Sequence, residues 1–259
     1  MKRIKPLIIL ALLTLFSCNQ EAVKSNNQTN LELTNPFTTK FLTESLRKDL
    51  PRLVLNDEID QILRNKLKTD AVVKNIYQAI KLNADEVMQM PFLERIQIGK
   101  RLLSVSREML RRINMLGMVY HVEKDPKILE RIDGEVKAVC AFSDWNPSHY
   151  LDVGEMSMAV AFALDWTSGA LPDSTKELAV NALIEKGINP SYETDKRSNT
   201  GWINGNNNWN QVCNGGMIAA AIAIAERDPE LAAKTIRRSI DGLPHALDEY
   251  GPDGVYPEG

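Results

Sequence analysis

The densest group of side chains able to bind or polarise a substrate lies in residues 202–217, which hold six Asn, one Gln and two Trp. One or two Asn at a helix start need no special role, because their side chains cap the first turn. Asn207, Gln211 and Asn214 are spaced to lie on roughly one face of a helix. Burying unpaired amides is costly, so a polar ligand such as a saccharide would satisfy them.

A second group, residues 142–156, combines aromatic, amide, imidazole and carboxylate side chains. Trp and Tyr rings can stack on sugar rings, while Asn, His and carboxylates bind hydroxyls. A purely structural interpretation places a turn at Pro147, a hydrogen-bonded His149 and an N-capping Asp152. Composition alone slightly favours that structural interpretation.

A third group, residues 253–259, reads Asp-Gly-Val-Tyr-Pro-Glu-Gly, where Asp-Gly and Pro predict a turn. Tyr256 and Glu258 are candidate ligand contacts, and an ordinary exposed loop is the alternative. The sequence stops within this segment, so a partial chain is expected.

The elements that must position these groups are helices, because apolar residues recur at steps of three and four almost throughout. Helices are expected over residues 71–90 and 93–120, and very apolar ones over 153–164 and 212–225. Four further helix starts are predicted from capping residues: Asp57, Asp125 before Pro126, Ser174 with Glu177, and Asp228 before Pro229.

The Ala-rich residues 219–225 suit close packing on all sides and therefore an inner helical layer. Amphipathic segments between the apolar ones suit an outer layer. The pattern predicts an all-α α/α toroid or helical-hairpin solenoid, because a four-helix bundle has no place for so many segments.

The N-terminus has the features of a targeting segment: three basic residues, a short apolar run over 7–16, then Ser17-Cys18. Residues 1–18 are predicted to be a lipoprotein-type signal peptide with Cys18 lipidated; a plain secretory signal is the alternative. The protein would then be exported to the periplasm or anchored to the outer membrane through its lipid. Polar residues 19–45 are expected to form a flexible tether, and 46–259 the helical domain.

Charge and cysteine content exclude some classes. The net charge is −3 with no basic stripe, so no nucleic-acid partner is expected. With three His in the chain, no multi-His metal site is predicted. Cys140 and Cys213 are in apolar helical sequence, where two buried thiols are favoured over a disulfide.

Taken together, residues 144–156, 208–216 and 253–259, with 94–103 upstream, resemble the heparinase II/III-like family of polysaccharide lyases. The resemblance covers roughly residue 50 to the end, and its first two segments in order are specific. It implies an incomplete α/α toroid followed by a C-terminal β-sandwich, which would be missing from this chain. It also implies an acidic polysaccharide or oligosaccharide as the partner.

The resemblance implies β-elimination on a uronic-acid-containing polymer, as in heparin or alginate lyases. An amide or imidazole neutralises the charge that develops at the uronate carboxylate, a Tyr or His removes the C5 proton, and a Tyr protonates the departing O4. The step needs no cofactor or metal, although the missing domain leaves room for a structural metal.

The implied catalytic residues are Asn207 and Asn208, at positions where many relatives have a His, and Tyr256. The family's catalytic Tyr is expected slightly beyond Gly259, so Tyr256 is the nearest substitute and the fragment alone is expected to be incomplete. The implied substrate-binding residues are His149, Tyr150, Glu155, Trp202, Trp209, Asn210, Gln211, Asn214 and Glu258.

Two other functions stay open. A glycoside hydrolase on an α/α scaffold would use two carboxylates across a cleft, chosen from Asp144, Asp152, Glu155, Asp253 and Glu258. The cluster of neutral amides argues against it, because hydrolysis does not need one. A non-catalytic, lipid-anchored glycan-binding protein is the third interpretation.

Overall fold

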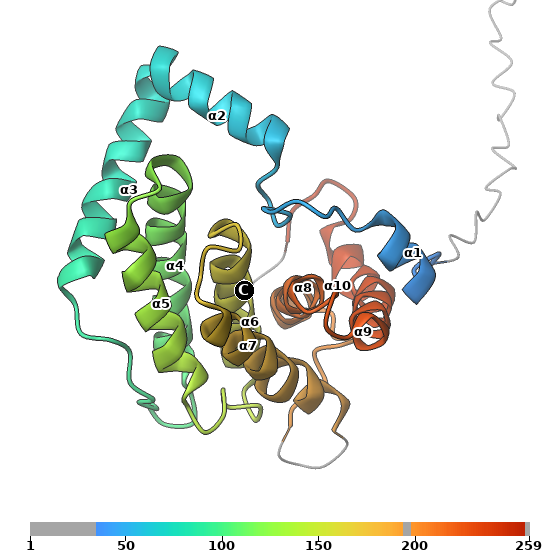
Figure 1. Cartoon of the computed structure of the whole chain (residues 1–259). Helices are drawn as coiled ribbons and strands as arrows, with labels where there is room; N and C mark the ends of the chain where they lie inside the picture. Colours follow the sequence, from blue (N-terminus) through green and yellow to red (C-terminus); the bar gives the residue numbers. More distant parts are fainter. Residues whose placement is uncertain (1–34, 194–197, 257–259) are drawn as a thin grey trace, which may run out of the picture. The chain divides into compact units, whose positions relative to one another are not determined.

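Helices make up the computed structural model of this chain, which describes residues 35–193 and 198–256 (Figure 1). No strand occurs in these ranges beyond a single antiparallel bridge between Ile98 and Arg101. The helices pack as antiparallel pairs, so the all-α prediction is confirmed. None of the helices in the described part is long and apolar enough to cross a bilayer.

The elements follow one another in a simple order. They are α1 Thr39–Ser45, α2 Asp57–Thr69, α3 Ala71–Gln89, α4 Leu103–Glu123, α5 Pro126–Cys140, α6 Tyr150–Trp166, α7 Asp173–Ala182, a π-helical turn Leu183–Ile188, a 3₁₀ turn Asn189–Tyr192, α8 Asn208–Ala223, α9 Pro229–Gly242, α10 Pro244–Leu247 and a 3₁₀ turn Asp248–Tyr250.

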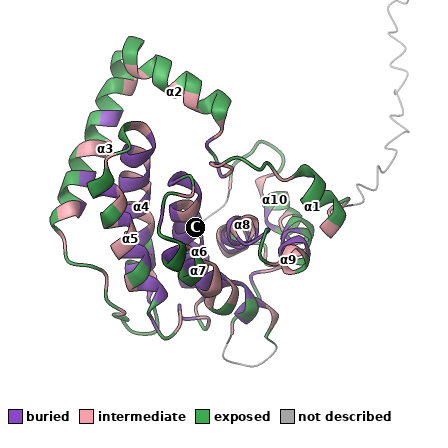
Figure 2. Cartoon of the chain, in the orientation of Figure 1, coloured by how far each residue is buried: buried purple, intermediate pink, exposed green. Residues whose placement is uncertain are grey.

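Helices α4, α6 and α8 lie side by side with α6 in the middle, and they are the most buried part of the fold (Figure 2). The three run in the same direction. Near their starts, Arg107 of α4 pairs with Glu155 of α6; nearer their ends, Gly117 of α4 faces Trp166 of α6. The connecting helices return antiparallel, so all three inner helices begin at the same end.

The contact between α6 and α8 is a backbone-to-backbone approach at two glycines. A Cβ added at Gly216 would lie 2.2 Å from the carbonyl oxygen of Gly154. A Cβ at Gly154 would lie 3.1 Å from Cα of Cys213. Buried alanines on both helices, including Ala161 and Ala219, continue this close packing, as expected for an inner layer.

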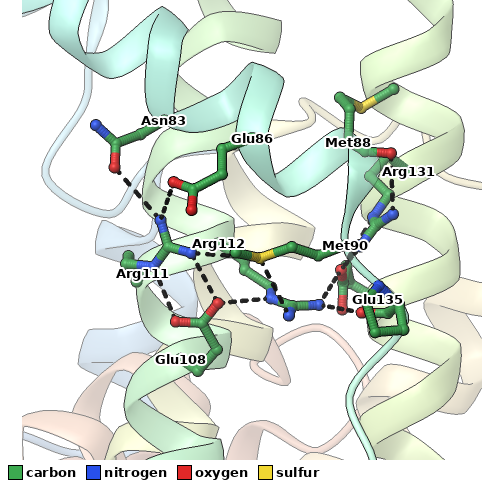
Figure 3. Close-up of polar contacts among 10 residues, drawn as sticks. Asn83, Glu86, Met88, Met90, Glu108, Arg111, Arg112, Arg131 and Glu135 are labelled. Atoms are coloured by element: carbon green, nitrogen blue, oxygen red, sulfur yellow. Dashed lines mark hydrogen bonds and ion pairs between the residues drawn. The ribbon is translucent and has the colours of Figure 1, made fainter.

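A buried ion-pair network holds the segment after α3 against α4 and α5 (Figure 3). Glu135 of α5 is fully buried and accepts from Arg112 at 2.8 Å and from Arg131 at 2.6 Å. Arg112 also donates to the carbonyl of Pro91 at 2.8 Å and to Glu108 at 2.9 Å. These bonds fix the path of the chain just before residues 92–102.

Several predicted elements are confirmed. The helix expected over 71–90 is α3, and Asp125 and Asp228 cap α5 and α9 as predicted. The apolar segments 153–164 and 212–225 lie within or overlap α6 and α8. Cys140 and Cys213 are both buried free thiols, and burial raises the pKa of Cys140 to about 12.

The long helix expected over residues 93–120 begins ten residues later, at Leu103. Gly99 has a φ of +62°, and the backbone N–H of Leu102 donates to the Asp152 carboxylate. The apolar Ile96 and Ile98 that suggested a helix are exposed. A tertiary hydrogen bond therefore sets the start of α4, and the local pattern does not reveal it.

Two caps and one boundary also differ. Asn56, rather than Asp57, caps α2, and α7 begins at Asp173 with no side-chain cap from Ser174. The range expected to be a tether, 19–45, includes α1, which packs on α9 and buries Leu42. The earlier part of that range lies outside the described residues, as does Cys18.

Replacing Gly216 with Ala should destabilise the fold by about 2 kcal/mol, because its Cβ would overlap the backbone of α6. The matched control is Gly215→Ala, whose Cβ would meet only Met158 at 3.6 Å. That control should raise the free energy of unfolding by less than about 1 kcal/mol. Urea denaturation measures both, and equal stabilities would contradict the close contact.

Glu135→Gln should lower the free energy of unfolding by about 3 kcal/mol, because it leaves two buried guanidinium groups undercompensated. Glu86→Gln is the control, since Glu86 is exposed and its ion pair with Arg111 spans 3.9 Å. That change should cost less than about 0.5 kcal/mol. Similar losses in the two variants, measured by urea denaturation, would show that the network does not stabilise this junction.

Candidate functional site

The segments singled out in the sequence meet at the end of the fold where α4, α6 and α8 begin. Arg95 donates to the Asp144 carboxylate at 2.6 Å, and Asn146 donates to the Lys100 carbonyl at 2.8 Å. The backbone N–H of Asn199 donates to the Pro147 carbonyl at 2.9 Å. We call this cluster of helix starts and preceding loops the amino-end site.

His149 immediately precedes α6 and is oriented by Asp152 three residues later. Its Nδ1 lies 2.7 Å from Oδ1 of Asp152, which is fully buried. Oδ2 of Asp152 accepts from the Leu102 N–H and from Asn146 Nδ2, both at 2.6 Å. The His149 ring meets the Trp209 ring edge-on, with centroids 4.7 Å apart.

Glu155 lies one turn beyond Asp152 on the same face of α6. It pairs with Arg107 of α4, whose side chain is 63% exposed and therefore reaches solvent beside the site. Desolvation raises the pKa of Glu155, while the hydrogen bond and charge of Arg107 oppose that shift. His149, Asp152 and Glu155 thus form one titratable stripe that begins at the helix start.

The predicted amides at the start of α8 serve different purposes. The side chain of Asn207 is exposed and caps the helix by accepting from the Trp209 N–H at 3.1 Å. Asn208 is half-buried in the first turn. Gln211 accepts from the Tyr250 hydroxyl at 3.2 Å, and its buried Nε2 has no partner among the described residues.

Asn210 and Asn214 lie deeper and hold the loop before α8 in place. Nδ2 of Asn210 donates to the carbonyls of Ile203 and Gly242, each at 2.9 Å. Asn214 donates to Ile203 at 3.3 Å, and both residues are fully buried. Both amides thus donate within the fold, while their buried Oδ1 atoms have no partner among the described residues.

Tyr150 and Trp202 are also internal. The Tyr150 hydroxyl donates to the Gly187 carbonyl at 2.6 Å, and burial raises its pKa. The centroid of its ring lies 4.9 Å from that of Trp202. The guanidinium of Arg238 lies over the Trp202 ring and donates to the Ser191 hydroxyl. Neither aromatic side chain is positioned for sugar stacking in this conformation, apart from the edge of Trp202 at the pocket described next.

A pocket of about 220 Å³ opens at the amino-end site. Asn199, Gly201, Trp202, Asn207 and Trp209 line it. It combines indole and amide groups, as sugar recognition requires. Two other pockets have a more apolar lining and lie elsewhere. One surrounds Arg52 between the C-terminal ends of α6 and α8, and the other lies between α1, α8 and α9. Neither of these contains a residue predicted from the sequence to do chemistry.

Tyr256 is connected to the amino-end site through Tyr250. The two rings stack with centroids 5.0 Å apart, and Tyr250 is bonded to Gln211. This path links Tyr256 to Gln211 in the first half of α8. Glu258 lies outside the described residues.

Sequence reasoning missed several members of the site. Arg107, Asn146 and Tyr250 had no distinguishing local pattern: Arg107 lies 48 residues from Glu155, and Tyr250 lies 39 residues from Gln211. Asn146 has a positive φ of 64°, which Asn tolerates better than most residues. Asn146 lies within residues 142–156, but no local pattern indicates its bond to Asp152.

Among the described residues, no group of three or more His, Cys, Asp or Glu side chains is arranged to hold a metal ion. No family model matches the chain, and no curated protein matches it either.

Proposed function

We propose that this chain is a polysaccharide lyase that cleaves a uronic-acid-containing polymer by β-elimination, on a helical array of the α/α toroid type. The proposal includes export and a lipid anchor at Cys18, which lies outside the described residues. The observation that carries it is the meeting of exposed amides, indole rings and an oriented imidazole at one end of a parallel helix row. Parallel inner helices returning through outer ones are the repeat from which such a toroid is built.

The chemistry requires charge neutralisation first. As a uronate loses its C5 proton, negative charge grows on the carboxylate oxygens, and nearby N–H donors stabilise it. Asn207 is exposed beside the pocket, and the amino end of α8 adds the partial positive charge of the helix dipole. Asn208, in the same first turn, is the second candidate for this role.

Proton transfer requires a base and an acid within reach of the sugar. The candidate groups are His149 and Tyr256. The His149 ring contacts Trp209 of α8, and Tyr256 is connected to Gln211 of α8 through Tyr250. No metal or organic cofactor is needed for this step. An acidic polysaccharide or oligosaccharide is the proposed partner, with Trp209 at the pocket as the ring contact.

A glycoside hydrolase remains the second candidate, because the raised pKa of Glu155 is a property of general acids. The other candidate carboxylates among the described residues are less suited to acid–base catalysis. Asp144 is bound by Arg95, and Asp152 accepts three hydrogen bonds. Asp253 accepts from the Val255 N–H in an exposed turn.

The purified chain should release unsaturated uronate products from at least one of alginate, heparan sulfate, chondroitin sulfate and ulvan. These products absorb in the near ultraviolet, and hydrolysis products do not. Depolymerisation without this absorbance would support the hydrolase and contradict the lyase. Saturable binding of a polymer with no depolymerisation would instead support a glycan-binding protein.

Asn207→Asp should reduce kcat/KM by about 10²-fold, because it places a carboxylate where the substrate's charge must be neutralised. Asp caps a helix as well as Asn does, so thermal stability should change little. Asn56→Asp is the matched control: Asn56 caps α2 in the same way, far from the site. Unchanged kinetics in the Asn207 variant would remove this residue from the mechanism.

A further inference from the structure

The environment of Asp152 leaves no freedom in the direction of its hydrogen bonds. The Leu102 backbone N–H can only donate, and it faces Oδ2 at 2.6 Å. The Asn146 side chain has a fixed orientation as well, because its Nδ2 also faces the Lys100 carbonyl, which can only accept. Its Oδ1 accepts from Ser148 at 2.9 Å. Oδ2 of Asp152 is therefore an acceptor of two hydrogen bonds.

The same carboxylate faces His149. With Oδ1 of Asp152 as the acceptor, the 2.7 Å contact places a proton on Nδ1 of His149. In the neutral ring, the lone pair is then on Nε2. The sequence separation of three residues at the start of α6 makes this pairing local and rigid.

Nε2 of His149 is the unusual atom in this arrangement. It is buried and has no hydrogen-bond partner among the described residues. Leaving a buried acceptor without a hydrogen bond is unfavourable. Trp209, at the start of α8, lies against the ring, and a donor that replaces this contact would satisfy the lone pair.

We propose that Asp152 is a positioning residue that holds His149 in its Nδ1–H form, so that Nε2 is the proton acceptor toward the saccharide. This inference rests on the proposed function for its catalytic part. It assigns the base to His149 rather than to Tyr256. Trp209 is then the aromatic side chain that lies against the proposed base.

The step balances without any further reactant. The C5–H bond breaks and its proton passes to Nε2, while the electron pair forms the C4–C5 double bond and the C4–O bond breaks. The departing oxygen takes a proton from the Tyr256 hydroxyl, and solvent then restores both side chains. The imidazolium that forms is stabilised by the Asp152 carboxylate.

Asp152→Asn tests the positioning role, because the two fixed donors at Oδ2 decide which way the new amide turns. Its oxygen must face Leu102 and Asn146, so its NH₂ faces Nδ1 of His149. A donor at that place forces the proton from Nδ1 to Nε2. The variant keeps the size and the buried contacts of the carboxylate, so it should fold.

Nitrogen-15 NMR of the imidazole gives the decisive result. We expect Nδ1–H in the wild-type chain and Nε2–H in Asp152→Asn, with kcat reduced at least about 10²-fold and KM changed less than about threefold. Asp165→Asn is the matched control, since Asp165 is a buried carboxylate at the other end of α6 that accepts from Arg52 and Leu53. That control should leave the tautomer and kcat unchanged.

Several outcomes would overturn the inference. Nε2–H in the wild-type chain would do so without any variant, as would an unchanged kcat after the tautomer has switched. If no polymer yields unsaturated products, the proposed function fails separately. Alginate oligosaccharides added to the labelled chain then decide: a shift of the His149 Nε2 resonance supports the acceptor contact, and no shift rejects it.

Discussion

Two glycines set the distance between α6 and α8, and the rest of the site depends on that distance. Gly154 and Gly216 bring the two backbones into direct contact, which any side chain at Gly216 would prevent. Because α4 joins the same row in the same direction, the starts of all three helices come together. Residues from three distant parts of the sequence thereby reach hydrogen-bonding distance of each other. The buried network around Glu135 fixes the approach of the chain to α4 from the outer side.

Asp152 connects this packing to the chemistry. It terminates the loop before α4 by accepting from Leu102, supports the turn at Asn146 and orients His149. The same buried carboxylate therefore sets both the path of the loop before α4 and the orientation of the His149 ring. The proton-accepting role that we propose for His149 depends on these hydrogen bonds.

The sequence was a good guide wherever the controlling interaction is local. Apolar spacing predicted α3 and the inner helices, and Asp-Pro pairs predicted the starts of α5 and α9. It failed at α4, where the N–H of Leu102 is bound by a side chain 50 residues away. It also failed to separate the amides: Asn207, Asn210 and Asn214 have the same chemistry in the sequence. Only packing shows that the first is exposed and the other two are scaffold. The roles of Arg107 and Tyr250 depend on long-range contacts and could not be read locally.

We propose that a uronate polymer binds where the inner helices begin. Hydrogen-exchange mass spectrometry with alginate, heparan, chondroitin and ulvan oligosaccharides tests this directly. The account predicts that at least one of them slows exchange in residues 146–155 and 207–211. Protection confined to the opposite end, around Arg52 and Glu226, would contradict it, as would the absence of protection with every oligosaccharide.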